Sequence, residues 1–302
     1  MRHTARDMTE NTSASPHPLD HLVLPTASLD VARARLTLLG FTVAPTGIHP
    51  FGTENCCVFL TDGTYLEPLA VADRQAAATA IANRNVFVVR DRTYREENGD
   101  EGFSAVALGT ESAAADHARY MEAGLSAGDA LSFSRAFTDA TGKSDTASFK
   151  LAFAATGKAT DAFLFACERI NAPNVDRTAL QAHANGATGI VEIVAASGEP
   201  FEQRNVISIA AGIKAQGGGT VYELPNAVVT VLDPAAYSAR FGIPAGAPSE
   251  LRFAGIVFSV RHGDTVAKLL AANSVEHHMR GGDIIVPPAP GQGAAFIFRE
   301  IA

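Results

Sequence analysis

The segment LDHLVLPTASLDVARARLTLLGFTVAPTGIHPFGTENCCVFLTDGTYLEPLAV, residues 19–71, sets a pattern that the rest of the chain repeats. It opens with a short apolar stretch, residues 19–25, in which alternation places His21 on one face of a predicted strand. Ser28 is a typical N-cap residue. Apolar residues then recur at spacings of three and four up to Gly40, which predicts a helix that ends at this glycine.

Three further strands are predicted after this helix. Asp62-Gly63 is a dipeptide typical of two-residue β-hairpins. The strand that follows it carries a lone carboxylate, Glu67, on the same face as Tyr65 and Leu69. The order of elements is therefore βαβββ, with the three later strands at residues 41–48, 55–61 and 64–71.

The same order of elements returns further along the chain. In residues 103–169, Gly124 closes the helix as Gly40 does in the first copy. A third copy, residues 183–232, is short by a strand, and a fourth occupies residues 251–301. These four βαβββ modules predict an α+β fold in which modules pair into two curved mixed sheets, with helices outside and cups on the concave faces.

We expect three parts along the chain. Residues 1–18 are polar and predict a disordered tail, residues 19–172 an N-terminal domain of two modules, and residues 173–302 a C-terminal domain of two modules. Between the first two modules, residues 73–83 predict a helix and residues 90–100 a charged loop. Turns are predicted at residues 141–143 and 157, and a flexible glycine run at residues 217–219.

Bulk composition argues against several classes of function. The 24 Lys and Arg residues against 32 Asp and Glu give a net charge of −8, so clustered cations for a nucleic acid are not expected. The apolar runs are far shorter than a membrane span, and the first residues lack the apolar core of a secretory signal. Three cysteines form no disulfide framework and suit a reducing interior. We therefore expect a cytoplasmic protein without a nucleic-acid or membrane partner.

His21 and Glu67 are the first candidates for chemistry. Imidazole and carboxylate are ligands for Zn, Ni, Fe or Mn. Without a metal the same two groups can act as acid and base, because burial raises the pKa of a carboxylate and histidine titrates near neutrality. A structural His–carboxylate pair between two strands is the alternative. His49 and Asn55 flank a glycine-containing loop at the mouth of the first module, where they are candidates for binding a polar substrate group.

Four motifs resemble a known family. They are a strand that opens Asp-His, a helix that ends Leu-Gly-Phe, and the segments HPFGTEN and GTYLE, at residues 20–21, 39–41, 49–55 and 63–67. Together they are similar to the glyoxalase-like branch of the vicinal oxygen chelate superfamily. The likeness returns in HANGA, residues 183–187, and in the closing strands, residues 281–300.

This resemblance implies paired modules whose cups often hold a divalent metal, with ligands on the first and fourth strands. His21 and Glu67 fall at those positions. The second module departs from the pattern, because its first strand offers only Ser104 as a polar residue. His183 is then a candidate third ligand or catalytic base. The candidate substrate-binding residues are His49, Asn55, Glu168, Arg169, His183 and Asn185.

Three functions stay open at this point. The first is a lyase or isomerase that binds a small carbonyl-bearing or oxygen-rich molecule in the N-terminal cup, through an enolate that a metal stabilises. The second is a non-catalytic protein that sequesters a small molecule of the antibiotic type. The third is a ring-cleaving dioxygenase, whose two-His, one-carboxylate iron site only His21, Glu67 and His183 supply. We favour an enzyme, with a small-molecule ligand, and leave open a homodimer.

Overall fold

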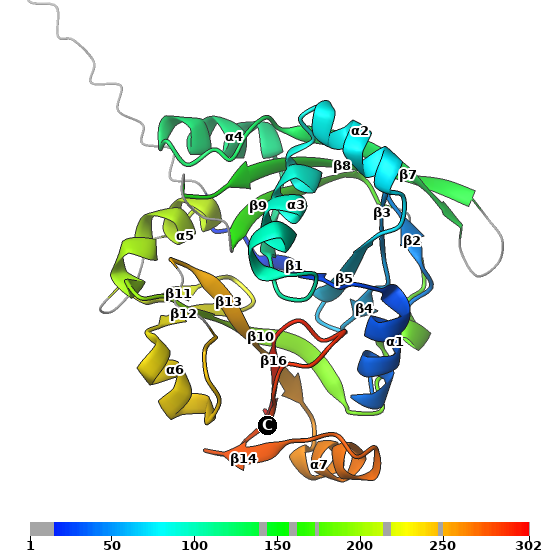
Figure 1. Cartoon of the computed structure of the whole chain (residues 1–302), viewed down its shortest axis with the longest axis vertical. Coiled ribbons are helices and arrows are strands. Elements are labelled where there is room, and N and C mark those ends of the chain that lie inside the picture. The colour runs from blue at the N-terminus through cyan, green and yellow to red at the C-terminus, as the bar shows by residue number, and fades with distance from the viewer. Residues whose placement is uncertain are drawn as a thin grey trace, which may run out of the picture.

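The computed structural model describes residues 15–138, 144–156, 162–172, 175–213, 219–246 and 250–301. Within these residues the chain forms one nine-stranded and one seven-stranded sheet, both mixed and curved (Figure 1). The predicted α+β class with two curved mixed sheets is confirmed. The predicted turns at residues 141–143 and 157, and the glycines 217 and 218, lie outside the described residues.

The first sheet contains the first two modules. Its strand order is β2-β3-β5-β1-β6-β9-β8-β7, with β4 paired to β5. The two modules meet where β1 pairs antiparallel with β6, and within each module the first strand runs parallel to the last. The elements are β1 (Leu19–Pro25), α1 (Leu29–Leu38), β2 (Gly47–Ile48), β3 (Thr53–Asn55), β4 (Val58–Phe59), β5 (Tyr65–Val71), α2 (Arg74–Ala82), α3 (Val86–Asn98), β6 (Ala105–Thr110), α4 (Ala113–Glu122), β7 (Leu131–Thr138), β8 (Ser144–Ala154) and β9 (Phe163–Asn171).

The second sheet repeats this plan, with β10 and β13 antiparallel at the meeting of the modules and the order β11-β12-β10-β13-β16-β15-β14. Within the described residues its third module is one strand short, as the sequence indicated. The elements are a 3₁₀ helix (Thr178–Gln181), β10 (Ala187–Ala196), a 3₁₀ helix (Pro200–Gln203), α5 (Arg204–Ala211), β11 (Val221–Glu223), β12 (Val228–Leu232), α6 (Pro234–Phe241), β13 (Arg252–Val260), α7 (Gly263–Ala272), β14 (His278–Arg280), β15 (Asp283–Val286) and β16 (Ala295–Glu300).

Local signals in the sequence account for the first helix. The Ser28 side chain accepts a hydrogen bond from the Asp30 amide, and Gly40 adopts a φ of 84° just after the helix. The strand predicted at residues 41–48 was wrong for most of its length, because only Gly47 and Ile48 pair with β3.

The charged loop predicted at residues 90–100 is instead most of helix α3. Asn85 caps its first turn by accepting from the Val88 amide. The charges hid an apolar stripe, since Phe87 and Tyr94 are buried on one side of the helix. An Arg95–Asp91 pair at 2.8 Å adds a charged contact one turn apart. Amphipathic spacing within a charged sequence therefore decided the helix.

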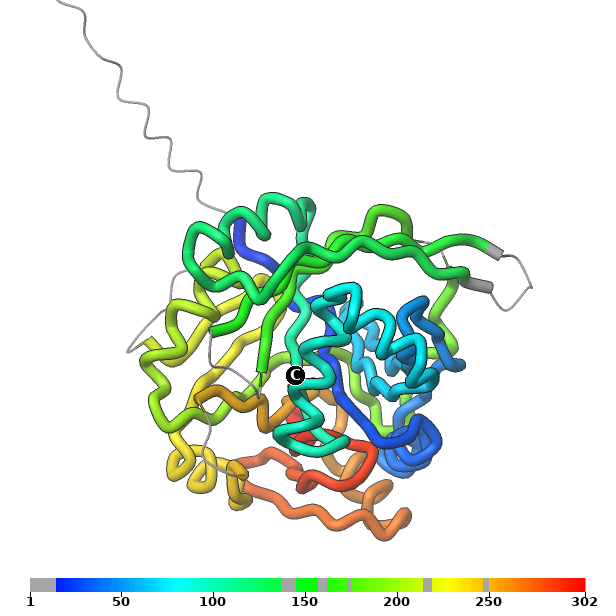
Figure 2. Tube along the Cα trace, turned by 45° about the horizontal axis from the view of Figure 1, so that its top comes forward, coloured from blue at the N-terminus to red at the C-terminus, as the bar shows by residue number. Residues whose placement is uncertain are grey.

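Helices lie on both faces of each sheet, so the expectation that they all pack outside was wrong. The helices α1, α4, α5 and α7 share a core with the outer faces of both sheets. The helices α2 and α3 pack instead on the inner face of the first sheet, beside the β7–β8 strand pair (Figure 2). Helix α6 packs on the inner face of the second sheet, where Tyr237 and Phe241 belong to one buried cluster with Val194, Val257 and Ile297.

The tail prediction ended at residue 18, and its first 14 residues lie outside the described chain. Next to β1, however, His17 is buried, and its Nε2 lies 2.8 Å from Oδ1 of Asp116 on α4. None of the helices in the described ranges is long and apolar enough to cross a membrane.

Phe41 connects the two sheets and gives a test of the shared core. Its ring lies 5.2 Å from that of Phe258 and 6.0 Å from those of Phe296 and Phe298. Because truncating a buried Phe removes apolar contacts and leaves a cavity, we expect Phe41→Ala to lower the free energy of unfolding by about 3–5 kcal/mol in urea titrations. Phe201→Ala, at a ring 64% exposed, is the control and should change it by no more than about 0.5 kcal/mol. Equal losses in the two variants would contradict a shared core.

Candidate functional site

The first and last strands of module one bring His21 and Glu67 together. β1 and β5 run parallel with Val23 opposite Glu67, and both candidates point to the inner face. Nε2 of His21 lies 3.4 Å from Oε2 of Glu67, and both side chains are buried. The sequence thus predicted this pair correctly as neighbours on the cup side of the sheet.

The β2–β3 hairpin adds two more groups to the same carboxylate. Asn55 donates from Nδ2 to Oε1 of Glu67 at 2.6 Å, and Nε2 of His49 lies 3.5 Å from the same oxygen. Nδ1 of His49 bonds with the Thr53 hydroxyl at 2.9 Å. Gly52 makes this tight loop possible, because its φ is 87° and a Cβ there would lie 2.5 Å from the Asp73 carbonyl oxygen. Both loop candidates therefore converge on Glu67.

Asp20 and Arg169 hold His21 from behind. Nδ1 of His21 lies 2.6 Å from Oδ1 of Asp20, and Arg169 donates to both Asp20 oxygens at 2.8 and 2.7 Å. Because Asp20 accepts from Nδ1, Nε2 is the nitrogen that faces Glu67. Arg169, a predicted substrate-binding residue, is thus tied to Asp20 on β1. Asp20 itself was missed as a site residue, although its place beside His21 on an apolar strand was a usable signal.

Burial and neighbouring charges set the protonation states in this cluster. Burial alone lowers the pKa of His21, but hydrogen bonds to Asp20 and Glu67 and their negative charges raise it above its ordinary 6.5. Burial alone raises the pKa of Glu67, but the hydrogen bond and charge of His21 lower it to about 2. Burial lowers the pKa of His49 to about 4. The two carboxylates thus favour the cationic form of His21, while near neutral pH Glu67 is an anion and His49 is neutral.

The cluster opens into a small cavity of about 40 Å³ on the inner face. Its walls are mostly aromatic, and alternate residues of β7, β8 and β9 supply one side of it. His21 stacks on Tyr65 with ring centroids 4.5 Å apart, and His49 stacks on Phe51 at 5.0 Å. The lining residues are His21, His49, Phe51, Tyr65, Glu67, Phe87, Phe133, Arg135, Phe149, Leu151, Phe165 and Cys167. The strand alternation Phe133-x-Arg135 was the signal for the missed Arg135.

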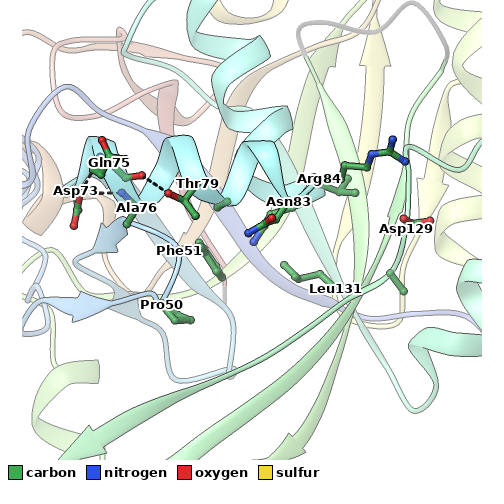
Figure 3. A pocket seen from close by; sticks show the side chains of 14 residues that line it. Pro50, Phe51, Asp73, Gln75, Ala76, Thr79, Asn83, Arg84, Asp129 and Leu131 are labelled. Carbon is green, nitrogen blue, oxygen red and sulfur yellow. Dashed lines mark hydrogen bonds between the residues drawn. The ribbon is translucent and has the colours of Figure 1, made fainter.

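A wider cleft of about 710 Å³ lies next to this cavity, between helix α2 and the start of β7 (Figure 3). Phe51 lines both the cleft and the cavity. Asn83 and Arg84 face the cleft at the end of α2, and Leu131 lies on its β7 side (Figure 3). Arg84 has a φ of 58°, a left-handed conformation uncommon for a residue with a side chain. The Phe51 side chain is therefore shared by the wall of the cleft and the wall of the cavity that holds the charged cluster.

The structure does not bring the other three candidates to Glu67. Glu168 accepts a hydrogen bond at Oε2 from the Ala113 amide, at the first turn of α4. Nδ1 of His183 accepts from the Thr42 amide and its Nε2 bonds with the Phe59 carbonyl, so both ring nitrogens have backbone partners. Asn185 is buried and donates to the Leu39 carbonyl. Of these three side chains, none lines the cavity.

A metal does not fit this set of residues. Over the described residues, no group of three or more His, Cys, Asp or Glu side chains is arranged to hold a metal ion. Oε1 of Glu67 is taken by the Asn55 amide, and the two imidazoles face different carboxylate oxygens. His183 does not join them to form a two-His, one-carboxylate set. A catalytic metal usually has three protein ligands, whereas the two imidazoles here approach different oxygens of one carboxylate and the described side chains are not arranged around one metal position.

The inner face of the second sheet is covered differently from that of the first. Its inner face also carries a buried carboxylate, Glu192, but Arg240 and Arg299 pair with it at 2.7 and 3.1 Å. The Thr230 hydroxyl donates to it as well. Helix α6 lies over this face and Tyr237 donates to a backbone carbonyl of β13. The space is thus filled by protein.

The histidine protonation states can be measured directly. We expect histidine NMR titrations to show His21 still protonated above pH 6.5 and His49 neutral down to about pH 4. By linkage, the raised pKa of His21 adds stability that is complete below pH 6.5 and is lost as pH rises through the folded-state value. Glu67→Gln should lower the pKa of His21, because one of its two carboxylate partners is removed. Signals are assigned with His21→Gln and His49→Gln, and an unchanged His21 titration in Glu67→Gln would contradict the pairing.

Comparisons with known proteins agree with the fold. No curated protein matches the sequence. A hypothetical protein from Staphylococcus aureus is similar in structure, with a TM-score of 0.60 and 12% identity. The match covers 94% of this chain and 99% of the Staphylococcus aureus chain. A mutant of 4-hydroxymandelate synthase from Streptomyces coelicolor has a TM-score of 0.60 and 14% identity, and the match covers 95% of this chain and 93% of the synthase chain. The Mn(II)-bound glyoxalase from Novosphingobium aromaticivorans has a TM-score of 0.50 and 11% identity, and the match covers 94% of this chain and 82% of the glyoxalase chain.

These structural likenesses, at such low identity, show the fold alone. The sequence itself gives the family, because the model of the glyoxalase-like domain matches residues 19–207, more than half of the chain. This match spans the first sheet, with its whole charged cluster, and continues through β10 into α5. The chain therefore belongs to the glyoxalase-like domain family.

Proposed function

We propose that this protein binds a small carbonyl-bearing molecule in the N-terminal cavity and moves a proton at the carbon next to the carbonyl, as a lyase or isomerase does. The observation that carries the proposal is the convergence of His21, His49 and Asn55 on the buried carboxylate of Glu67. A cation and an anion side by side in a buried site supply a proton donor and a proton acceptor together.

Each group has a defined part in this chemistry. Glu67 is deprotonated near neutral pH and accepts the proton from the carbon, which leaves an enolate. The carboxylates of Asp20 and Glu67 favour the protonated form of His21, whose Nε2–H donates to the oxygen on which the negative charge develops. Asp20 keeps that nitrogen facing the site by holding Nδ1. Asn55 orients the carboxylate from its other oxygen.

The cavity walls support this proposal. Phe87, Phe133 and Phe165 surround the charged groups with apolar surface. Such walls exclude water, which strengthens the interaction of His21 with a developing oxyanion and protects an enolate from stray protonation. Family membership supports the same chemistry, and the structural likeness to a glyoxalase and to 4-hydroxymandelate synthase is consistent with a small-molecule site.

A non-catalytic binding protein is the second candidate. It is favoured by the fact that both oxygens of Glu67 already have protein partners, so the cluster is satisfied without a substrate. In this case His21 and Glu67 form a structural pair at the floor of an aromatic cup. A ligand then binds to the walls and no proton moves.

Hydrogen–deuterium exchange distinguishes the two functions. We expect the wild-type protein to speed up exchange of the hydrogens beside the carbonyl in at least one of a panel of small aldehydes, ketones and oxo acids, followed by NMR in D2O. Glu67→Gln should lower that rate by about 100-fold or more, because it removes the proton acceptor. Glu192→Gln, which changes an equally buried carboxylate of the second sheet, should leave the rate unchanged.

The outcome for the second candidate is also specific. Compounds that raise the melting temperature of the wild-type protein without any exchange would support a binding protein and contradict the proposed catalysis. Equal loss of exchange in Glu67→Gln and Glu192→Gln, measured with both proteins folded, would also contradict the assigned role of Glu67.

Metal content tests the conclusion drawn from the ligand geometry. We expect the purified protein, after reconstitution with Zn, Ni, Fe or Mn and desalting, to retain less than one ion per chain, because no three ligand side chains of the described residues are arranged to hold one. Elemental analysis measures this ratio. One ion per chain in the wild type that is lost in His21→Ala would contradict the conclusion and would show that the cluster binds a metal.

A further inference from the structure

The charged groups that line the cavity do not balance. His21 and Glu67 face each other, and behind them Asp20 pairs with Arg169. Arg135 also lines the cavity, and within the described parts of the chain its guanidinium has neither a hydrogen bond nor an ion pair. The wall therefore carries one positive charge in excess.

The backbone makes room for this cation. Gly47 lies opposite it on β2, and a Cβ at Gly47 would lie 2.5 Å from Nη1 of Arg135 and 2.6 Å from Oδ1 of Asn55. The guanidinium thus occupies the space above Gly47, beside the amide that bonds to Glu67. Any larger residue at position 47 would push the guanidinium away from this place.

The surroundings of Arg135 favour a charged partner. Phe133 and Phe149 lie on the same side of the cavity, and their rings are 5.2 Å apart. A cation next to aromatic surface is partly desolvated, and its attraction for an anion is stronger there than in water. Guanidinium groups bind carboxylates with two parallel hydrogen bonds.

We propose that the ligand of this cavity is a small carbonyl compound that carries a carboxylate, and that Arg135 binds the carboxylate. This inference rests on the proposed function only in placing the carbonyl at His21. Arg135 on β7 and His21 on β1 line the same cavity from two strands, so a molecule with an anion and a carbonyl contacts both. Arg135 is then the residue that selects for charge.

The cavity also limits the size of the part that it holds. A volume of about 40 Å³ corresponds to roughly three water sites at about 10–15 Å³ each. A short carboxylic acid matches this space. Any longer part of the molecule must extend past Phe51, which borders the wider cleft.

Binding of pyruvate and pyruvamide tests the proposal, since the two probes have similar shape and differ in charge. We expect wild-type protein to bind pyruvate about 10- to 100-fold more tightly than pyruvamide, by ligand-observed NMR, which is the range for hydrogen bonds to a charged group. Arg135→Gln should abolish this preference, and Arg135→Lys should keep part of it.

A matched control removes a nearby charge outside the cavity. Arg177 stacks on Phe59 with its guanidinium carbon 4.4 Å from the ring centre and does not line the cavity, so Arg177→Gln should keep the wild-type preference. Equal loss in Arg135→Gln and Arg177→Gln would show a general charge effect and overturn the proposal. So would equal affinity of the wild type for both probes, or no binding of either probe.

Exchange measurements separate this proposal from the catalytic one. If pyruvate binds through Arg135 but its methyl hydrogens do not exchange, the carboxylate site stands and the proposed proton transfer fails. If both probes exchange at equal rates in a Glu67-dependent way, the proton transfer stands and the role of Arg135 is overturned.

Discussion

The buried carboxylate of Glu67 is the constraint around which the first half of the molecule is arranged. Placing an anion on an apolar sheet face is costly unless a cation and hydrogen-bond donors compensate it. His21 comes to it through the parallel pairing of β1 with β5, and Asn55 through the hairpin that precedes β5. Asp20 and Arg169 extend the compensation one layer further, so that each charge beside the carboxylate has its own partner.

The two sheets have the same plan but differ in what covers their inner faces. In the first sheet α2 and α3 cover part of the face, and a space remains between them and the β7–β8 pair. In the second sheet α6 packs across the face, and two arginines neutralise Glu192. The same module thus gives an open site once and a filled core once. The difference depends on the segments between modules, since the sheets themselves are alike.

Several parts of the fold could be predicted from the residues alone. Alternation and capping residues predicted β1, α1 and β5. The matching helix ends at Gly40 and Gly124 indicated the repeat in the first two modules, and the order of elements indicated the other two. The helix at Val86–Asn98 was missed, because its charged residues outnumber the buried stripe that decides its packing. His183 looked like a ligand because it precedes a module, yet its nitrogens bind two backbone groups.

The sequence by itself determined the family, the α+β class and the pairing of His21 with Glu67, because these depend on local periodicity and on which strand carries each residue. Only the tertiary structure decided which groups complete the cluster. His49 and Asn55 reach Glu67 because a hairpin folds over the strand. Arg135 reaches the same cavity from β7, the edge strand at the far side of the sheet, since sheet curvature brings distant strands together. Spacing along a chain does not encode such convergence, which depends on how the sheet bends and on what fills its inner face.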